Sequence, residues 1–254
     1  MPKPHLSCGT CPIRHNAVCA LCTEAELRRL NGIKYYRNYV PGQPIVHAGA
    51  QHHFVASVVS GTVTLSQTLV DGRVQMVGLL LPSDFIGRPG RAETLYTAEA
   101  ITPVMLCCFR RKPFEALMGE IPHIAQRLLE MTLDELDAAR NWMLVLGRKR
   151  ARERIASFLV MLAWRRGWLQ RGGGRLRQAR GIDKAAARRF DLPLRREEMA
   201  NYLGLTLETV SRQMSALKQD GVIVQQGQRH VAIPDFARLL EEAGEGSHSS
   251  LMGG

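Results

Sequence analysis

The sequence predicts an α+β protein in which an antiparallel β-roll is followed by a long helix and then by a small domain of short helices and a hairpin. Three observations predict this order. Short β-rich runs separated by glycines fill residues 42–87, apolar residues recur every three to four positions in 122–147, and two short amphipathic helices around a glycine follow Arg195. The 254 residues allow two domains.

The β-roll is predicted from successive hairpin signals, and the domain is expected to continue to about Phe109. Asp71-Gly72 lies between two β-rich runs and is typical of a tight hairpin turn, because both central positions of that turn need positive φ. The predicted strands are Pro44–His47, Phe54–Ser60, Thr62–Thr68 and Val74–Leu81. Strands joined by such short turns pair antiparallel, and they predict a jelly-roll-like domain.

After Pro122 the pattern becomes that of a helix running to about Gly147, followed by a second helix from about Arg150 to Arg165. The apolar stripe of the first helix consists of Leu129, Leu133, Leu136, Ala139, Met143 and Leu146. This stripe fits either a helix lying on its own roll or the seam between two parallel helices of a homodimer. Charged neighbours such as Glu130 and Asp134 narrow the stripe and favour the homodimer.

The composition shifts along the chain give the predicted organisation. The run around 166–189 is rich in arginine and contains Gly172-Gly173-Gly174, so it is interpreted as a basic linker, and the end of the chain as a Gly/Ser-rich tail. The predicted segments are an N-terminal arm (1–22), the roll (23–121), the dimerisation helix and hinge (122–165), the linker (166–189), the second domain (190–236) and the tail (237–254).

The second domain reads as helix, tight turn, helix and wing. Gly204 supplies the left-handed residue that ends the first helix, and Thr206 can cap the second. The second helix would bury its apolar face, which consists of Val210, Met214 and Leu217. Gly221 would end that helix, and Val222–Val224 with His230–Ile233 would form a two-stranded wing.

The exposed side of the second helix carries side chains suited to reading DNA. Arg212 can donate to guanine O6 and N7, and the Glu208 carboxylate can accept from cytosine N4. The alternative is an ordinary surface ion pair between these two residues, which are spaced i to i+4. The formal net charge of +11 agrees with double-stranded DNA as a partner.

Six cysteines in a chain expected to be cytoplasmic favour metal or redox chemistry over disulfides. Cys8, Cys11, Cys19 and Cys22 form two Cys-x-x-Cys pairs, which suit a structural zinc or an iron–sulfur cluster. Spacing alone favours zinc. A second source of thiols exists at Cys107-Cys108.

The run from Asn201 to Arg212 resembles the helix-turn-helix signature of the CRP/FNR family of transcription regulators. The resemblance is carried by Tyr202-Leu203-Gly204-Leu205-Thr206 and by Glu208-Thr209-Val210-Ser211-Arg212. The roll glycines also match that family: Gly42, Gly49, Gly61, Gly72 and Gly87. The resemblance implies a homodimer on an inverted repeat of TTGAT-type half-sites. Glu208, Ser211 and Arg212 would read each half-site, with Thr206 and Thr209 completing the DNA-binding set. It also implies contact with RNA polymerase, for which the loop 88–91 is a candidate.

The FNR branch of that family holds an oxygen-sensitive [4Fe-4S] cluster with three cysteines near the N-terminus and one on a late strand of the roll. By resemblance the ligands here are Cys8, Cys11, Cys19 and Cys107. Adjacent strand residues point to opposite faces, so Cys108 is expected to be a core residue, and Cys22 a bystander. The seven residues between Cys11 and Cys19 depart from the five of the best-known members. The alternative is a structural zinc on the first four cysteines, with a different effector.

Three other classes of function are disfavoured by the sequence. The cyclic-nucleotide branch captures phosphate with an Arg-Ser pair, but this region reads Glu93-Thr94-Leu95-Tyr96, so no cyclic nucleotide is expected. An enzyme of cupin type is not expected, because His47, His52 and His53 lack a matching acidic ligand. The apolar stretches are too short to cross a bilayer and residues 1–25 lack a signal-peptide core, which predicts a cytoplasmic protein without membrane contact.

Overall fold

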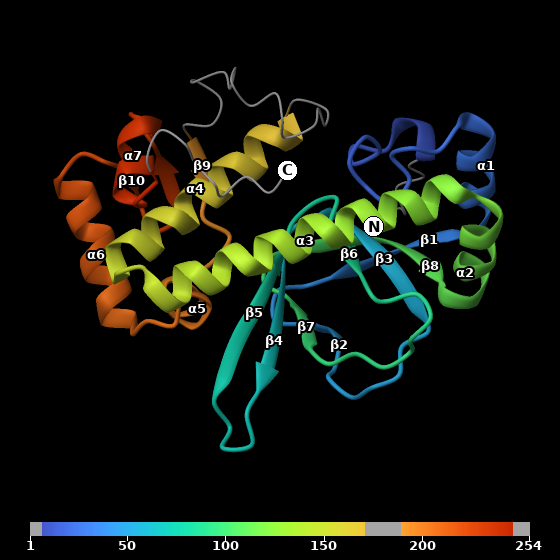
Figure 1. Ribbon diagram of the computed structural model, residues 1–254, viewed down its shortest axis with the longest axis horizontal. Helices are drawn as coiled ribbons and strands as arrows, with labels where there is room; N and C mark the ends of the chain where they lie inside the picture. The colour runs from blue at the N-terminus through green and yellow to red at the C-terminus, as the bar shows by residue number, and fades with distance from the viewer. Residues whose placement is uncertain (1–6, 171–188, 246–254) are drawn as a thin grey trace. The chain divides into compact units, whose positions relative to one another are not determined.

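The computed structural model describes residues 7–170 and 189–245, and the chain divides into two compact units, 1–132 and 133–254 (Figure 1). The helices are η1 (Cys8–Thr10), α1 (Glu24–Ile33), α2 (Arg111–Glu120), α3 (Pro122–Arg148), α4 (Ala151–Gln170), α5 (Arg196–Leu203), α6 (Leu207–Gln219) and α7 (Phe236–Glu242). The strands are β1 (Lys34–Tyr39), β2 (Pro44–Val46), β3 (Phe54–Ser60), β4 (Val63–Thr68), β5 (Val74–Leu80), β6 (Phe85–Ile86), β7 (Thr97–Ala100), β8 (Val104–Arg110), β9 (Arg189–Asp191), β10 (Val224–Gln226) and β11 (His230–Ala232).

The N-terminal unit is the predicted antiparallel roll, which is confirmed. It contains two four-stranded sheets, with strand orders β1-β8-β3-β6 and β2-β7-β4-β5. Alternate residues of each strand point to opposite sides of a sheet. On β3 and β8 the side chains of Ala56, Val58, Leu106 and Cys108 therefore enter the interior of the roll, where they pack in one buried cluster.

The opposite face of the β1-β8-β3-β6 sheet is covered by the N-terminal arm, α1, α2 and the first turns of α3. Val55 and Val59 of β3 and Cys107 and Phe109 of β8 lie on this face, in a second buried cluster. Phe114 of α2 and residues of the arm close the cluster from the other side. Figure 1 shows α1 and α2 at the same end of this sheet. The arm is thus an integral part of the unit's packing.

The C-terminal unit contains the predicted winged helix-turn-helix arrangement, which is also confirmed. α5 and α6 are joined by a short turn, and β9, β11 and β10 form a three-stranded antiparallel sheet in which β11 is central. α7 packs against α4, and α6 also contacts α4. The fold thus surrounds α6 on its buried side and leaves the other side open.

The structure corrects several predicted boundaries. Part of the expected linker 166–189 is ordered: α4 continues to Gln170, and Arg189 already begins β9, whose pairing with β11 holds it in the wing. Residues 171–188 of that linker lie outside the described residues. The first wing strand begins at Val224 and not at Val222, because Val222 and Ile223 are buried in the core.

The predicted tail, 237–254, is also wrong at its start. Residues up to Glu242 belong to α7, whose N-terminus is capped by the Asp235 side chain, and Ala243 and Glu245 are buried. The Lys149 ammonium donates to the Ala243 carbonyl at 2.7 Å, which fixes this segment. Residues 246–254 lie outside the described residues. The helix α1 and the strand β1, which precede the first predicted strand, were not predicted at all.

Candidate nucleic-acid interface and thiol site

The two helices α5 and α6 meet at a turn whose geometry is set by two residues. Gly204 has a φ of 61° and a ψ of 42°, the left-handed conformation that ends α5. The Thr206 side chain accepts a hydrogen bond from the Thr209 N–H at 3.2 Å and thereby caps α6. Both predicted roles are confirmed.

The face of α6 predicted to be buried is buried: Val210, Met214 and Leu217 are 0%, 1% and 0% exposed. On the other side Glu208, Ser211 and Arg212 are exposed, as is Thr206, and Thr209 is half-buried. Within the described part of the chain Glu208 and Arg212 form no ion pair with each other, so the alternative of a simple surface salt bridge has no support. The pKa of Glu208 is lowered by its own backbone N–H and by Thr206.

Three arginines hold the helices around this face. Arg152 of α4 binds the Glu242 carboxylate through Nε at 2.5 Å and Nη2 at 2.7 Å, and Asp220 at the end of α6 at 2.7 Å. Arg154 donates to the Leu203 carbonyl at 3.1 Å, next to the turn. Arg196 of α5 donates to Gln225 of the wing at 2.9 Å. Arg152 therefore holds α6 at its C-terminal end, and Arg154 holds the turn that precedes it.

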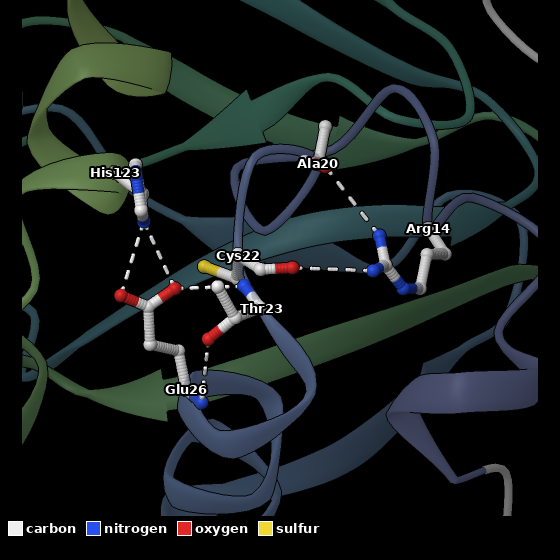
Figure 2. A network of polar contacts seen from close by, with 6 residues as sticks. All are labelled: Arg14, Ala20, Cys22, Thr23, Glu26 and His123. Carbon is white, nitrogen blue, oxygen red and sulfur yellow. Dashed lines mark hydrogen bonds and ion pairs between the residues drawn. The ribbon is translucent and has the colours of Figure 1, made fainter.

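The N-terminal arm folds as a series of tight turns that bring its cysteines inward. η1 carries Cys8, and backbone hydrogen bonds close turns at Cys11–Arg14 and Cys19–Cys22, at 3.0 and 3.1 Å. The Arg14 guanidinium donates to the carbonyls of Ala20, at 3.4 Å, and Cys22, at 3.2 Å, and so braces the second turn (Figure 2).

The structure brings four of the six thiols around one small cavity between the arm and the sheet. Its lining includes Cys8, Cys11 and Cys19 from the arm and Cys107 from β8. Neither Cys22 nor Cys108 lines it. Cys108 is fully buried in the roll interior on the other face of β8, and Cys22 is 3% exposed in the cluster beneath the arm.

Burial raises the pKa of the Cys11, Cys19 and Cys107 thiols and so favours their neutral form. Burial raises the pKa of Cys107 and raises that of Cys19 to about 12, and in both cases neighbouring cysteines of the cavity add to the rise. A bound cationic group would have to displace these protons. Among the described residues, no group of three or more His, Cys, Asp or Glu side chains is arranged to hold a metal ion. The four thiols are therefore related by the cavity that they line together.

The arm is also bonded to the start of α3. The Arg127 guanidinium donates to the carbonyl of Asn16, in the loop between Cys11 and Cys19, at 2.9 Å. Both carboxylate oxygens of Glu26 lie 3.0 Å from Nδ1 of His123, and one also accepts from the Thr23 N–H at 2.7 Å (Figure 2). The pKa of Glu26 is lowered by the Thr23 N–H and by His123.

Comparison with known proteins agrees with both halves of this description. Residues 153–242 match the family of Crp-like helix-turn-helix domains, and residues 36–120 match the family of cyclic nucleotide-binding domains. The chain is 62% identical over 244 residues to the transcriptional activator protein FnrL of Cereibacter sphaeroides, covering 96% of this chain and 94% of that protein. The chain belongs to the CRP/FNR family of transcription regulators.

Other members of the family show the same arrangement. The nitrogen fixation regulation protein FixK of Bradyrhizobium diazoefficiens is 35% identical over 222 residues, which is 87% of each chain. The structure of FixK2 from Bradyrhizobium japonicum has a TM-score of 0.72 and 31% identity, and the match covers 85% of this chain and 98% of that one. As a CRP/FNR regulator the protein is a DNA-binding transcription regulator and not an enzyme.

The apolar stripe of α3 is largely exposed. Leu129, Leu133, Leu136 and Met143 are 60%, 51%, 44% and 74% exposed, Ala139 is exposed and Leu146 is half-buried. No helix among the described residues has the length and apolar character that a membrane crossing requires.

Sequence reasoning missed the residues that support these sites. Arg127, Arg152 and Arg154 bind carbonyls or carboxylates distant in the sequence, and no local pattern distinguishes them from other arginines. Arg14 binds carbonyls only six and eight residues away, but these contacts depend on how the arm folds. One local signal was available, because Thr23 and Glu26 have the spacing of a capping box and do cap α1.

Proposed function

We propose that this protein is an oxygen-responsive, sequence-specific transcriptional activator in which Cys8, Cys11, Cys19 and Cys107 hold a [4Fe-4S] cluster. The observation that supports the proposal best is the shared cavity, which includes these four thiols and leaves out Cys22 and Cys108. The donor set suits the group, since iron–sulfur clusters are held by four thiolates in an apolar surrounding. The similarity to FnrL, which is named a transcriptional activator, agrees with activation.

The residues around the cavity would make the position of the arm depend on its ligands. When bound, the cluster supplies a link between arm and sheet that oxygen destroys. Cys107 lies on β8, which is hydrogen-bonded on both sides and cannot follow the arm. Cys11 and Cys19 flank the loop whose Asn16 carbonyl binds Arg127 of α3. A change in the arm would therefore reach the first turns of α3 directly.

The response of α3 would be a change in dimerisation. Its exposed leucines and Met143 form the apolar face that a second copy of the helix would cover. A homodimer places two recognition helices on an inverted repeat, and loss of one half removes half of the contacts to phosphate and bases. Control of dimerisation is thus an effective control of DNA affinity.

On DNA, α6 would present Glu208, Ser211 and Arg212 to TTGAT-type half-sites. All three side chains are exposed on one side of a helix that its capping residue and the three arginines hold in place. Activation would further involve RNA polymerase, and the exposed side chains of Arg88 and Arg91 in the loop after β6 are candidates for that contact.

The experiment that tests the proposal is an absorbance spectrum of protein purified without oxygen, repeated after air is admitted, with operator binding measured in parallel. We expect a brown protein whose broad visible absorbance fades in air together with operator binding. Cys107→Ala should lack the absorbance, whereas the matched variant Cys108→Ala, at the adjacent buried cysteine, should keep it. A colourless protein with one zinc per chain that is lost in Cys22→Ala would contradict the sensor and leave the DNA-binding function standing.

A further inference from the structure

Two hydroxyl side chains stand beside Cys107 in the thiol cavity. Cys107 is directly opposite Ser57 on β3 and directly opposite Tyr36 on β1, because β8 pairs antiparallel with both strands in this register. Directly opposed residues of antiparallel strands place their side chains on the same face, about 5 Å apart. Both Ser57 and Tyr36 line the cavity with the four thiols, and the rest of its lining is apolar.

The two hydroxyls differ in what they already bind. The Tyr36 hydroxyl accepts from the Lys34 ammonium at 3.1 Å and interacts with the Cys107 thiol. The Ser57 hydroxyl has no hydrogen-bond partner in the described structure, although Ser57 is only 2% exposed. A buried hydroxyl without a partner costs about 1–3 kcal/mol of stability, so such a group calls for a physical explanation.

The other residues around the cavity limit which group could accept a hydrogen bond from the Ser57 hydroxyl. The residues around the cavity other than the thiols and Tyr36 are Ile13, Ala17, Val18, Leu30 and Phe109, whose side chains neither donate nor accept hydrogen bonds. The acceptors that share the cavity are sulfur atoms. A neutral thiol is a poor acceptor, whereas a thiolate or an inorganic sulfide carries negative charge and accepts well.

We infer that Ser57 donates a hydrogen bond to the sulfur of the group bound at this cavity, and that Ser57 and Tyr36 together flank Cys107 as positioning residues for it. The inference rests on the proposed ligand set. A hydrogen-bond donor on each neighbouring strand withdraws electron density from the Cys107 sulfur. This slows oxidation of the bound group by oxygen and helps the site to retain the group. Ser57 thus helps to set how long the site survives in air.

The test compares anoxically purified wild type with Ser57→Ala. We expect Ser57→Ala to load but to lose its visible absorbance in air about tenfold faster, by analogy with the roughly 10–100-fold loss of metal affinity or activity that follows removal of an outer hydrogen-bond partner. Its iron–sulfur stretching bands in resonance Raman spectra should move to higher frequency, because a hydrogen bond to sulfur weakens the iron–sulfur bond. Ser57→Thr keeps the hydroxyl and should restore both properties.

The matched control is Ser83→Ala. Ser83 is also 2% exposed with an unpartnered hydroxyl, but it lies in the turn before β6 and does not line the cavity. We expect its decay and Raman bands to match the wild type. A brown wild type with Ser57→Ala unchanged in both readouts would overturn the role of Ser57 and leave the proposed function intact. A wild type that never contains iron and sulfide would instead overturn the proposed function itself, and the role of Ser57 with it.

Discussion

The contact between Arg152 and α7 should contribute measurably to the stability of the C-terminal unit. Arg152 and Glu242 are 27% and 24% exposed in their side chains, and they share two charge-assisted hydrogen bonds. Exposed ion pairs contribute about 0–1 kcal/mol, whereas breaking a buried pair costs about 3–5 kcal/mol. The intermediate exposure places the loss for Arg152→Met near 2 kcal/mol at neutral pH.

The assay is urea denaturation of the full chain without metal, followed by tryptophan fluorescence at one protein concentration. All three tryptophans of the chain, Trp142, Trp164 and Trp168, belong to the C-terminal unit, so the signal reports on that unit alone. A loss of about 2 kcal/mol moves the midpoint down by about 1 M urea when the slope is about 2 kcal/mol per M. Arg140→Met is the control, since the Arg140–Asp137 pair is 65% and 42% exposed and should contribute little.

The same variant makes a prediction about pH. The hydrogen bonds from Arg152 hold the pKa of Glu242 below its usual range. A carboxyl with a lowered folded-state pKa stabilises the fold fully above its unfolded-state pKa of about 4.3, and this stabilisation is lost as the pH falls through the folded value. The difference between wild type and Arg152→Met should therefore shrink at acidic pH. Equal losses in Arg152→Met and Arg140→Met at neutral pH, or a difference independent of pH, would refute the reasoning.

Two further substitutions test the DNA-reading face and the roll. Arg212→Ala should weaken operator binding by about 1–3 kcal/mol and relax the preference for guanine at one position of the half-site. Fluorescence anisotropy titrations with substituted half-sites would measure both effects. Equal weakening of binding to unrelated DNA would contradict base recognition by Arg212. Gly61→Ala should destabilise the roll by at least about 2 kcal/mol, because Gly61 has a φ of +87° and a Cβ there would lie 2.2 Å from the Pro103 carbonyl oxygen. Gly72 has a similar φ of +88° but open space around it, so Gly72→Ala should destabilise the roll less than Gly61→Ala. Faster hydrogen exchange of the β3 and β8 amides in Gly61→Ala than in Gly72→Ala would show this difference.

The parts of the fold that could be predicted are those specified by local signals. Gly204 and Thr206 have the roles assigned to them because a left-handed residue and a capping hydroxyl act on neighbours only a few residues away. The strand Phe54–Ser60 was predicted with its observed bounds, since it contains a phenylalanine and three valines and ends before a glycine. These patterns do not depend on the rest of the chain.

The elements that were missed depend on distant partners or were concealed by composition. β9 is three residues long, lies beside a run of arginines and exists through its pairing with β11, about forty residues later in the sequence. α7 was assigned to the tail because polar and Gly/Ser-rich residues follow it, although Asp235 gave a capping signal. The helix α1 was missed because it is only ten residues long and buries only Leu27 and Leu30, so its apolar pattern is weak.

The candidate site divides in the same way. The cysteines themselves and their spacing identified the candidate ligands. The alternation of side chains along a strand predicted that only one of Cys107 and Cys108 could face the site. The side chains that connect the site to the rest of the molecule, such as Arg127 and Ser57, could not be found, because each acts on a residue more than forty positions away. Their roles follow from tertiary register, which a single sequence does not state.

The neighbouring cysteines of β8 have a consequence for how such a sensor can change over time. Cys107 faces the arm and Cys108 faces the roll interior, so the register of β8 decides which of the two sulfur atoms faces the cavity. A single-residue insertion or deletion that shifted β8 against both of its partners would exchange the two, and the cavity would still contain a fourth thiol. The pair thus gives this strand a tolerance to small length changes that a lone cysteine would lack.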